Sequence, residues 1–364
     1  MKSWQTLTLL SLACAAFSCS GKVIALDAPL VEASDDPEVV AIVSERVEKL
    51  VVDRERLYWA GSHLSPKNSG ATWFLRSCDK RACATTLVTY DSQALAADSL
   101  FAVIGDQIYW YRADDGELAS CPVAGCNGAR RSLATESGFG AATFDSDYFY
   151  YSSSDSIFRL PLAEPSSRQL IRAATGLLQK LFVHQSFVYW LLGTDQSLGN
   201  GTRNAWLMRT LKDGSSPASD STLVTQYFGI SSNRGLGITA DDQLIYWTSN
   251  LFQGAVASCP LAGAPLASWV GGPLRAPQSL LRDGSRLYVQ HETKPYEYAL
   301  SSCLLPTCES SPPLALHLSS PEAFAVDDRD LYVATTEQDV SPHNSEVETV
   351  SRLRRSAKPD PEAP

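Results

Sequence analysis

The chain has 364 residues, a formal net charge of −10 and a pI near 5.0. An acidic chain of this kind is a poor partner for nucleic acid, because phosphate binding needs clustered Lys and Arg side chains. The notable basic cluster, Arg352, Arg354 and Arg355, stands at the end of the last repeat and is interpreted as part of a solvated edge strand. We therefore expect no nucleic-acid partner.

The N-terminus has the pattern of a secretory signal peptide, with Lys2 followed by an apolar stretch over 7–17. Residues 16–19, Ala-Phe-Ser-Cys, resemble a bacterial lipobox, which predicts cleavage before Cys19 and attachment of lipid to its thiol. Cleavage near residues 13–15 without lipid is the alternative. The favoured interpretation is an exported protein, periplasmic or at the cell surface, that is lipid-anchored to a bacterial membrane. No later segment is apolar and long enough to cross a membrane.

The composition of the rest of the chain indicates a folded domain between two segments that are not expected to fold. Residues 20–36 and 356–364 are rich in Pro, small and charged residues, which is typical of a tether and a loose tail. The predicted order is a signal peptide at 1–18, a tether at 19–37, a folded domain at 38–355 and a disordered tail at 356–364.

A short phrase occurs seven times between residues 57 and 333: an apolar residue, then Tyr, then usually another aromatic residue. The copies are Leu57-Tyr58-Trp59, Ile108-Tyr109-Trp110, Phe149-Tyr150-Tyr151, Val188-Tyr189-Trp190, Ile245-Tyr246-Trp247, Leu287-Tyr288-Val289 and Leu331-Tyr332-Val333. A period of about 40 to 57 residues, with several short strand patterns in each unit, is typical of a β-propeller. We predict an all-β fold over residues 38–355, a seven-bladed β-propeller.

An Asp stands five residues before the Tyr in five of the copies, where the first of four predicted strands ends. These residues are Asp53, Asp145, Asp241, Asp283 and Asp327, while Ile104 and His184 take their place in the other two copies. We expect each carboxylate to accept backbone N–H groups in the hairpin turn that follows, which is a structural role. The aromatic side chains of the phrase are expected to fill the space between neighbouring blades as core, and not to form a ligand cage.

The last unit has three strand patterns before the chain becomes rich in Pro and charge. Aligning the third unit with the first places residues 39–43 where a fourth strand belongs, although they precede the first blade. We predict that this N-terminal strand completes blade seven and closes the ring, which removes the open sheet edges.

Six cysteines form three Cys-x4-Cys pairs, each where the third strand of a unit turns into the fourth. The pairs are Cys78 with Cys83, Cys121 with Cys126, and Cys303 with Cys308. Cysteines that face each other across a tight hairpin can meet disulfide geometry, and export places them where disulfides persist. We predict three disulfides and not a zinc site, because the pairs lie in different blades and zinc needs four converging ligands. Cys259 occupies the place of Cys121 in its unit, but Ala264 replaces its partner, so a free thiol is expected there.

Residues 246–249, Tyr-Trp-Thr-Ser, together with 238–241, Ile-Thr-Ala-Asp, resemble the repeat of YWTD β-propellers found in lipoprotein receptors. They are more closely similar to bacterial exported lipoproteins with repeated Tyr-Trp-Thr-Asn phrases. The resemblance implies the architecture of residues 38–355 and a surface or periplasmic location, with no assigned chemistry. The receptors' Asp or Asn after Tyr-Trp-Thr, which ties neighbouring blades together, is Ser249 here, and no other copy keeps it.

The sequence is compatible with two functions, an enzyme and a binding module. Some propellers are calcium-dependent lactonases, in which oxygen ligands converge at the channel mouth. Glu48 and Glu322 stand nearest that mouth in two blades that become neighbours, and they are the candidate site for a channel-mouth hydrolase or lactonase-like enzyme. The chain has no nucleophile elbow, no His-Glu-x-x-His and no phosphate loop. We assign no catalytic residue and expect no metal or cofactor.

The favoured function is a binding or scaffold module with a protein or glycan ligand. Propellers bind partners through long loops on one face. The longest predicted loops, Gly61–Gly70, Gly193–Asn204 and Gln226–Gly235, fall on the same face. We expect a monomer that reaches the membrane through its lipid anchor.

Overall fold

The computed structural model describes most of the chain between residues 38 and 358. The described residues are 38–43, 45–64, 71–92, 100–112, 115–135, 139–153, 155–174, 177–197, 202–215, 222–231, 237–249, 255–262, 268–271, 274, 276–294, 297–305, 314, 323–340 and 347–358. The predicted signal peptide, the tether, Ala264, Cys308 and Glu322 lie outside them.

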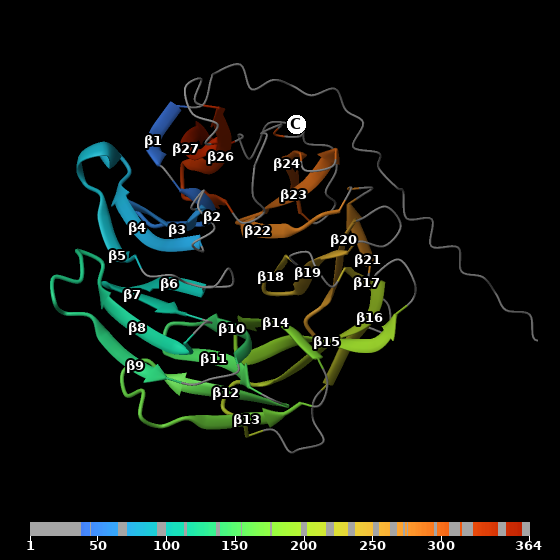
Figure 1. Cartoon of the computed structure of the whole chain (residues 1–364). Coiled ribbons are helices and arrows are strands. Elements are labelled where there is room, and N and C mark those ends of the chain that lie inside the picture. The colour runs from blue at the N-terminus through green and yellow to red at the C-terminus, as the bar shows by residue number, and fades with distance from the viewer. Residues whose placement is uncertain are drawn as a thin grey trace, which may run out of the picture.

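Seven antiparallel sheets form a ring, with the first strand of each blade nearest the centre (Figure 1). Blade 1 is β2 (Arg46–Val52), β3 (Arg56–Leu64), β4 (Ala71–Asp79) and β5 (Val88–Asp91); blade 2 is β6 (Leu100–Ile104), β7 (Gln107–Tyr111), β8 (Glu117–Pro122) and β9 (Arg131–Thr135); blade 3 is β10 (Phe139–Phe144), β11 (Tyr148–Ser153), β12 (Ser156–Pro161) and β13 (Gln169–Ala173). Blade 4 is β14 (Leu177–His184), β15 (Phe187–Ser197), β16 (Thr202–Leu211) and β17 (Thr222–Ser231); blade 5 is β18 (Ile238–Ala240), β19 (Leu244–Ser249), β20 (Ala255–Pro260) and β21 (Ser268–Gly271). Blade 6 is β22 (Ser279–Asp283), β23 (Arg286–Lys294) and β24 (Glu297–Leu304); blade 7 is β25 (Phe324–Val326), β26 (Asp330–Val340), β27 (Val347–Ala357) and β1 (Glu38–Val43). The predicted seven-bladed propeller is confirmed.

The hydrophobic core is divided into clusters that lie between neighbouring blades. Successive residues of a strand point to opposite faces of its sheet. Tyr58 of blade 1 therefore packs with Ile108 and Trp110 of blade 2, whereas Leu57 and Trp59 pack against blade 7. Tyr189 meets blade 5 in the same way. The side chains of the repeated phrase are core, as predicted, except that Tyr109 is only partly buried.

The N-terminal strand closes the ring. β1 pairs antiparallel with β27, from Glu38 opposite Arg355 to Val43 opposite Ser351. The backbone N–H of Val47, at the start of blade 1, also donates to Ser351 Oγ at 3.1 Å. The first and last blades are thus joined by residues about 300 positions apart in sequence, and the closure prediction is confirmed.

β27 corrects the interpretation of the basic cluster. This strand lies between β26 and β1, so Arg352, Arg354 and Arg355 stand on an inner strand of blade 7 and are partly buried. The strand also continues to Ala357, past the expected boundary at residue 355. The sequence interpretation failed because it took the end of the repeat for the edge of the sheet.

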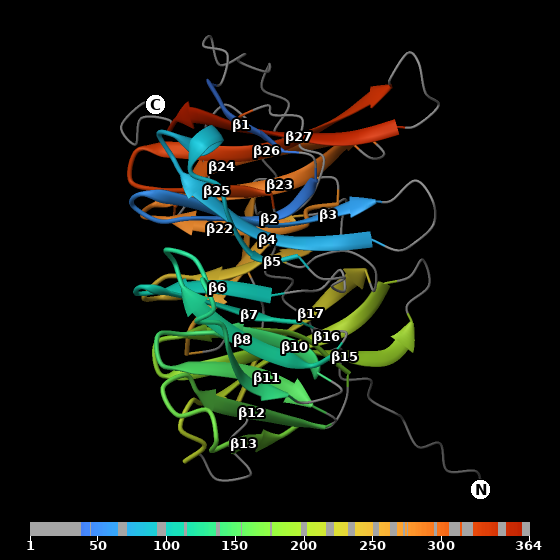
Figure 2. The same ribbon diagram turned by 60° about the vertical axis from the view of Figure 1, so that its left-hand side comes forward.

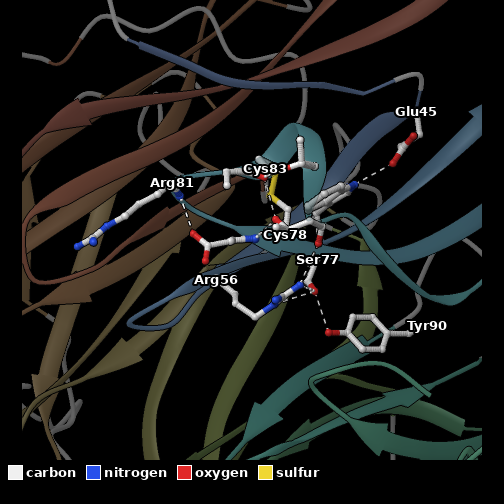
Figure 3. Close-up of a disulfide and its surroundings, with 12 residues drawn as sticks. Glu45, Arg56, Ser77, Cys78, Arg81, Cys83 and Tyr90 are labelled. Carbon is white, nitrogen blue, oxygen red and sulfur yellow. Dashed lines mark hydrogen bonds between the residues drawn. A yellow bond between two sulfur atoms is a disulfide. The ribbon is translucent and has the colours of Figure 1, made fainter. Parts of the chain in front are cut away.

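Two of the predicted disulfides are present, Cys78–Cys83 and Cys121–Cys126. Cys303 is also disulfide-bonded, but its predicted partner lies outside the described residues. Figure 3 shows the Cys78–Cys83 bond beside Ser77, whose hydroxyl lies 2.9 Å from Arg56 Nη2 and 2.8 Å from the hydroxyl of Tyr90. These bonds secure the turns between third and fourth strands.

Candidate binding site

The repeat aspartates organise the turns between first and second strands. Asp53 Oδ1 accepts the backbone N–H groups of Glu55 and Arg56 at 2.8 and 2.7 Å, and Oδ2 accepts the hydroxyl of Tyr58 at 2.7 Å. The same three kinds of bond are made by Asp145, Asp241 and Asp327. The backbone bonds were predicted, but the bond from the Tyr was missed. In these four copies the bond accounts for the spacing of five residues between Asp and Tyr.

Asp283 departs from this arrangement. Its strands are joined by a two-residue turn, in which Asp283 lies opposite Arg286 and Gly284 takes a positive φ of 56°. Within the described residues, the buried hydroxyl of Tyr288 has no hydrogen-bond partner. The expected backbone bonds to the Asp therefore hold for the other four copies, whose turns have the same number of residues but no glycine after the Asp.

Three lysines connect the aspartates to the next blade. Each is the first residue after a third strand: Lys80 after β4, Lys212 after β16 and Lys358 after β27. Lys80 bonds Asp327 of blade 7 at 2.6 Å and Lys212 bonds Asp145 of blade 3 at 2.8 Å, while Lys358 bonds Asp283 of blade 6. These ion pairs link neighbouring blades.

A cavity of about 690 Å³ opens where blade 7 meets blade 1, among these turns. Its walls are the turn after β25, the turn after β2 and the start of the turn after β4. The lining residues are Val52, Asp53, Arg54, Lys80, Arg81, Val326, Asp327, Asp328, Arg329, Asp330, Tyr332 and Arg355. We call it the seam cavity, because it lies where the ring closes.

Lys80 holds both sides of the seam cavity together. Its ammonium donates to the backbone oxygen of Asp53 at 2.8 Å and to Asp327 at 2.6 Å, and it lies 5.7 Å from the ring centroid of Tyr332. Burial alone would raise the pKa of Asp327, but the bonds from Lys80 and from two backbone N–H groups outweigh it and hold the pKa below its usual value. Asp327 is therefore an ionised, fully hydrogen-bonded part of the wall.

Arginines form the rim of the seam cavity. Arg54, Arg81 and Arg329 are exposed, and none of them makes an ion pair within the part of the chain that the structure describes. Arg355 instead pairs with Glu38 of β1, and this hydrogen bond raises its pKa. The lining contains five cations and four carboxylates, a net charge of +1 on a chain whose total is −10.

Of the predicted channel-mouth pair, Glu48 and Glu322, the structure describes Glu48 alone. Glu48 lies on β2 and accepts the hydroxyl of Ser62 at 2.8 Å, but Glu322 lies outside the described residues. Within the described part of the chain, no group of three His, Cys, Asp or Glu side chains could hold a metal ion. The pair stays a prediction.

Each of the expected long loops begins with strand residues, while residues 65–70, 198–201 and 232–235 lie outside the described part of the chain. β3 continues through Gly61 to Leu64, β15 continues through Gly193 to Ser197, and β17 includes Gln226 and ends at Ser231. Blades 6 and 7 also have long second strands, β23 and β26. Figure 2 shows the tips of β3/β4, β15/β16 and β26/β27 on one side of the ring, which we call the hairpin face. The seam cavity is on the other face, with the turns after first strands.

Within the described residues, His291 and Ser301 form a His–Ser hydrogen bond of the kind that activates the nucleophile of a serine hydrolase. Nε2 of His291 lies 2.8 Å from Ser301 Oγ, and Nδ1 lies 3.2 Å from the backbone oxygen of Glu292. Ser301 is 4 % exposed, and burial lowers the pKa of His291. A serine nucleophile must reach its substrate, so this hydrogen bond is part of the structure of blade 6.

Cys259 is the free thiol expected in blade 5. It is 1 % exposed in the cluster between blades 4 and 5, and burial raises the pKa of its thiol to about 12. A buried thiol of high pKa is unreactive. Its environment therefore favours a packing role over sensing.

No protein-family model matches this chain, and no curated protein sequence matches it. Solved structures resemble it in fold. The computationally designed Ika8 protein has 10% sequence identity and a TM-score of 0.54, over 89% of this chain and all of that one. The β-propeller domain of the Trilobed protease from Pyrococcus furiosus, described as having an open velcro topology, has 7% identity and a TM-score of 0.51, over 82% of this chain and 90% of that one.

A puromycin-hydrolyzing peptidase of Mycobacterium tuberculosis has 10% identity and a TM-score of 0.55. The match covers 84% of this chain but only 53% of the peptidase. At these identities the likeness shows the β-propeller fold and nothing about activity. In the described part of this chain, none of the residues belongs to a helix long and apolar enough to cross a membrane.

Proposed function

We propose that this protein is an exported β-propeller that acts as a binding or scaffold module, held at a bacterial membrane by lipid on Cys19. The observation that carries the binding function is the hairpin face, where several second and third strands extend beyond the ring (Figure 2). Trp206, on β16 of one such hairpin, is 37 % exposed. Exposed aromatic side chains are favoured in contacts with proteins and glycans, because they bury much area at low entropic cost.

Export is supported by the disulfides. Cys78–Cys83 and Cys121–Cys126 fit an oxidising compartment, since disulfides are rare in a reducing cytosol. The proposal of a lipid anchor is supported by the lipobox-like residues 16–19 in the sequence.

A hydrolase is the second candidate, and the similarity to a peptidase's structure is the observation in its favour. The described residues offer little for it, because Ser301 is buried and the aspartates of the turns already accept several hydrogen bonds. We therefore place binding first.

The anchor is tested by the change Cys19→Ser. We expect the wild-type protein to sediment with membranes of its native host and the variant to be released, because a lipid chain can no longer be attached. Fractionation and mass spectrometry of the mature N-terminus measure this, and Cys259→Ser is the control that leaves the lipobox unchanged. A wild-type N-terminus without lipid would refute the anchor and leave export and binding standing.

The hairpin face is tested with Trp206→Ala against an array of bacterial surface glycans and extracted envelope proteins. We expect binding to fall about tenfold or more, which corresponds to the loss of a buried aromatic contact. Leu87→Ala is the matched control, because Leu87 is an exposed apolar residue in the turn before β5, on the opposite face. Equal losses in both variants, or none in either, would show that the ligand does not bind at Trp206.

A further inference from the structure

We propose that the seam cavity is a second binding site, for a small ligand that carries two or more oxyanion groups, carboxylate or phosphate. This site is on the face opposite the hairpins and does not depend on the function proposed above. Its volume of about 690 Å³ lies within the usual range for small-molecule sites.

The walls of the cavity do not favour a cation. The carboxylate of Asp53 accepts two backbone N–H groups and the hydroxyl of Tyr58. That of Asp327 accepts two backbone N–H groups, the hydroxyl of Tyr332 and the ammonium of Lys80. These oxygens have little capacity left to coordinate a metal.

The cations of the rim are available, in contrast. Arg54 follows β2, Arg81 follows β4 and Arg329 precedes β26, so the three side chains come from three turns on both sides of the seam. All three line the cavity, are exposed and make no ion pair with another described residue. A guanidinium presents a planar fork of N–H donors that matches carboxylate and phosphate oxygens.

The remaining carboxylates of the lining limit what can bind. Asp328 is exposed, and Asp330 lies 3.4 Å from the hydroxyl of Tyr332 and interacts with Arg355. The lining carries a net charge of +1 and the whole chain a net charge of −10, so a ligand with a single negative charge would gain little binding energy. A ligand with several oxyanion groups can contact arginines of both blades at once.

Such a ligand would join blade 1 to blade 7. Arg54 and Arg81 belong to blade 1, and Arg329 belongs to blade 7. Because binding then requires the closed ring, ligand binding should stabilise the closure and raise the melting temperature.

The test uses the full mature protein with two probes, citrate for carboxylate and pyrophosphate for phosphate, at constant ionic strength. We expect calorimetry to show one site for at least one probe, and the stronger of the two to identify the ligand chemistry. In Arg81→Gln/Arg329→Gln the affinity should fall about tenfold or more. Arg131→Gln is the matched control, since it removes an exposed arginine from β9 of blade 2.

The variants should fold, because the side chains changed are exposed and make no ion pairs; circular dichroism of the free proteins measures this. Three outcomes would overturn the proposal: no binding of either probe, equal binding by the double variant and Arg131→Gln, or binding that acetate matches. Loss of affinity confined to the double variant would support it.

Discussion

A variant that lacks residues 20–44 is expected to unfold at a much lower temperature than one that lacks residues 20–34. The longer deletion removes all of β1 and leaves β27 with an open edge. It also removes Val43, which is buried against Leu353 and the Cys78–Cys83 bond. We expect a loss of about 3 kcal/mol or more, as for other large core deletions.

The shorter deletion is the control, because it leaves all of β1 in place. Differential scanning calorimetry of the two variants measures the effect. Equal melting temperatures would show that β1 contributes nothing to closure. A second measurement, proteolysis after β27, should show cleavage in the longer deletion alone.

Glu45→Ala is the point substitution with the largest expected effect. Glu45 has no exposed surface and lies between β1 and β2. Its Oε1 accepts Trp59 Nε1 at 2.8 Å, and both of its oxygens accept Arg76 Nη1 at 2.9 and 2.8 Å. Removing one partner of a buried ion pair leaves the other charge uncompensated, so we expect a loss of about 3–5 kcal/mol.

Chemical denaturation measures this loss, with Glu55→Ala as the control, since Glu55 is an exposed Glu in the turn after β2. Glu45→Gln should lose less than Glu45→Ala, because the amide oxygen can still accept one of these bonds. If Glu45→Ala and Glu55→Ala unfold at the same denaturant concentration, the buried pair has no net stabilising effect.

The blade arrangement could be predicted because each blade repeats the same local chemistry. The phrase around Tyr58 recurs with the same spacing, and the position of Val39–Val43 follows from aligning two repeats. The Cys78–Cys83 and Cys121–Cys126 bonds follow from a spacing within one turn. Interactions between residues that are close in sequence could therefore be predicted.

Interactions between blade 7 and blade 1 could not be predicted in this way. Lys80 and Asp327 are 247 positions apart, and the distance from the Tyr to the lysine varies with hairpin length. The sequence does contain a signal for these lysines, because each one directly follows a third strand. To use it, one must already know where β4, β16 and β27 end. The strand residues at the start of the predicted loop at Gly193–Asn204 were taken for a loop because the residues around Gly193 show no regular alternation of apolar and polar side chains.

The place where the chain enters the ring has a mechanical consequence. In the anchored state that we propose, a pull between membrane and propeller enters the described structure at Glu38, the first residue of β1. Glu38 pairs with Arg355, which lines the seam cavity, and the rest of β1 lies along β27. Tension along the tether would thus load the β1–β27 ladder as a shear, and the first contact to yield would release an arginine of the cavity. A soluble form without the anchor carries no such load.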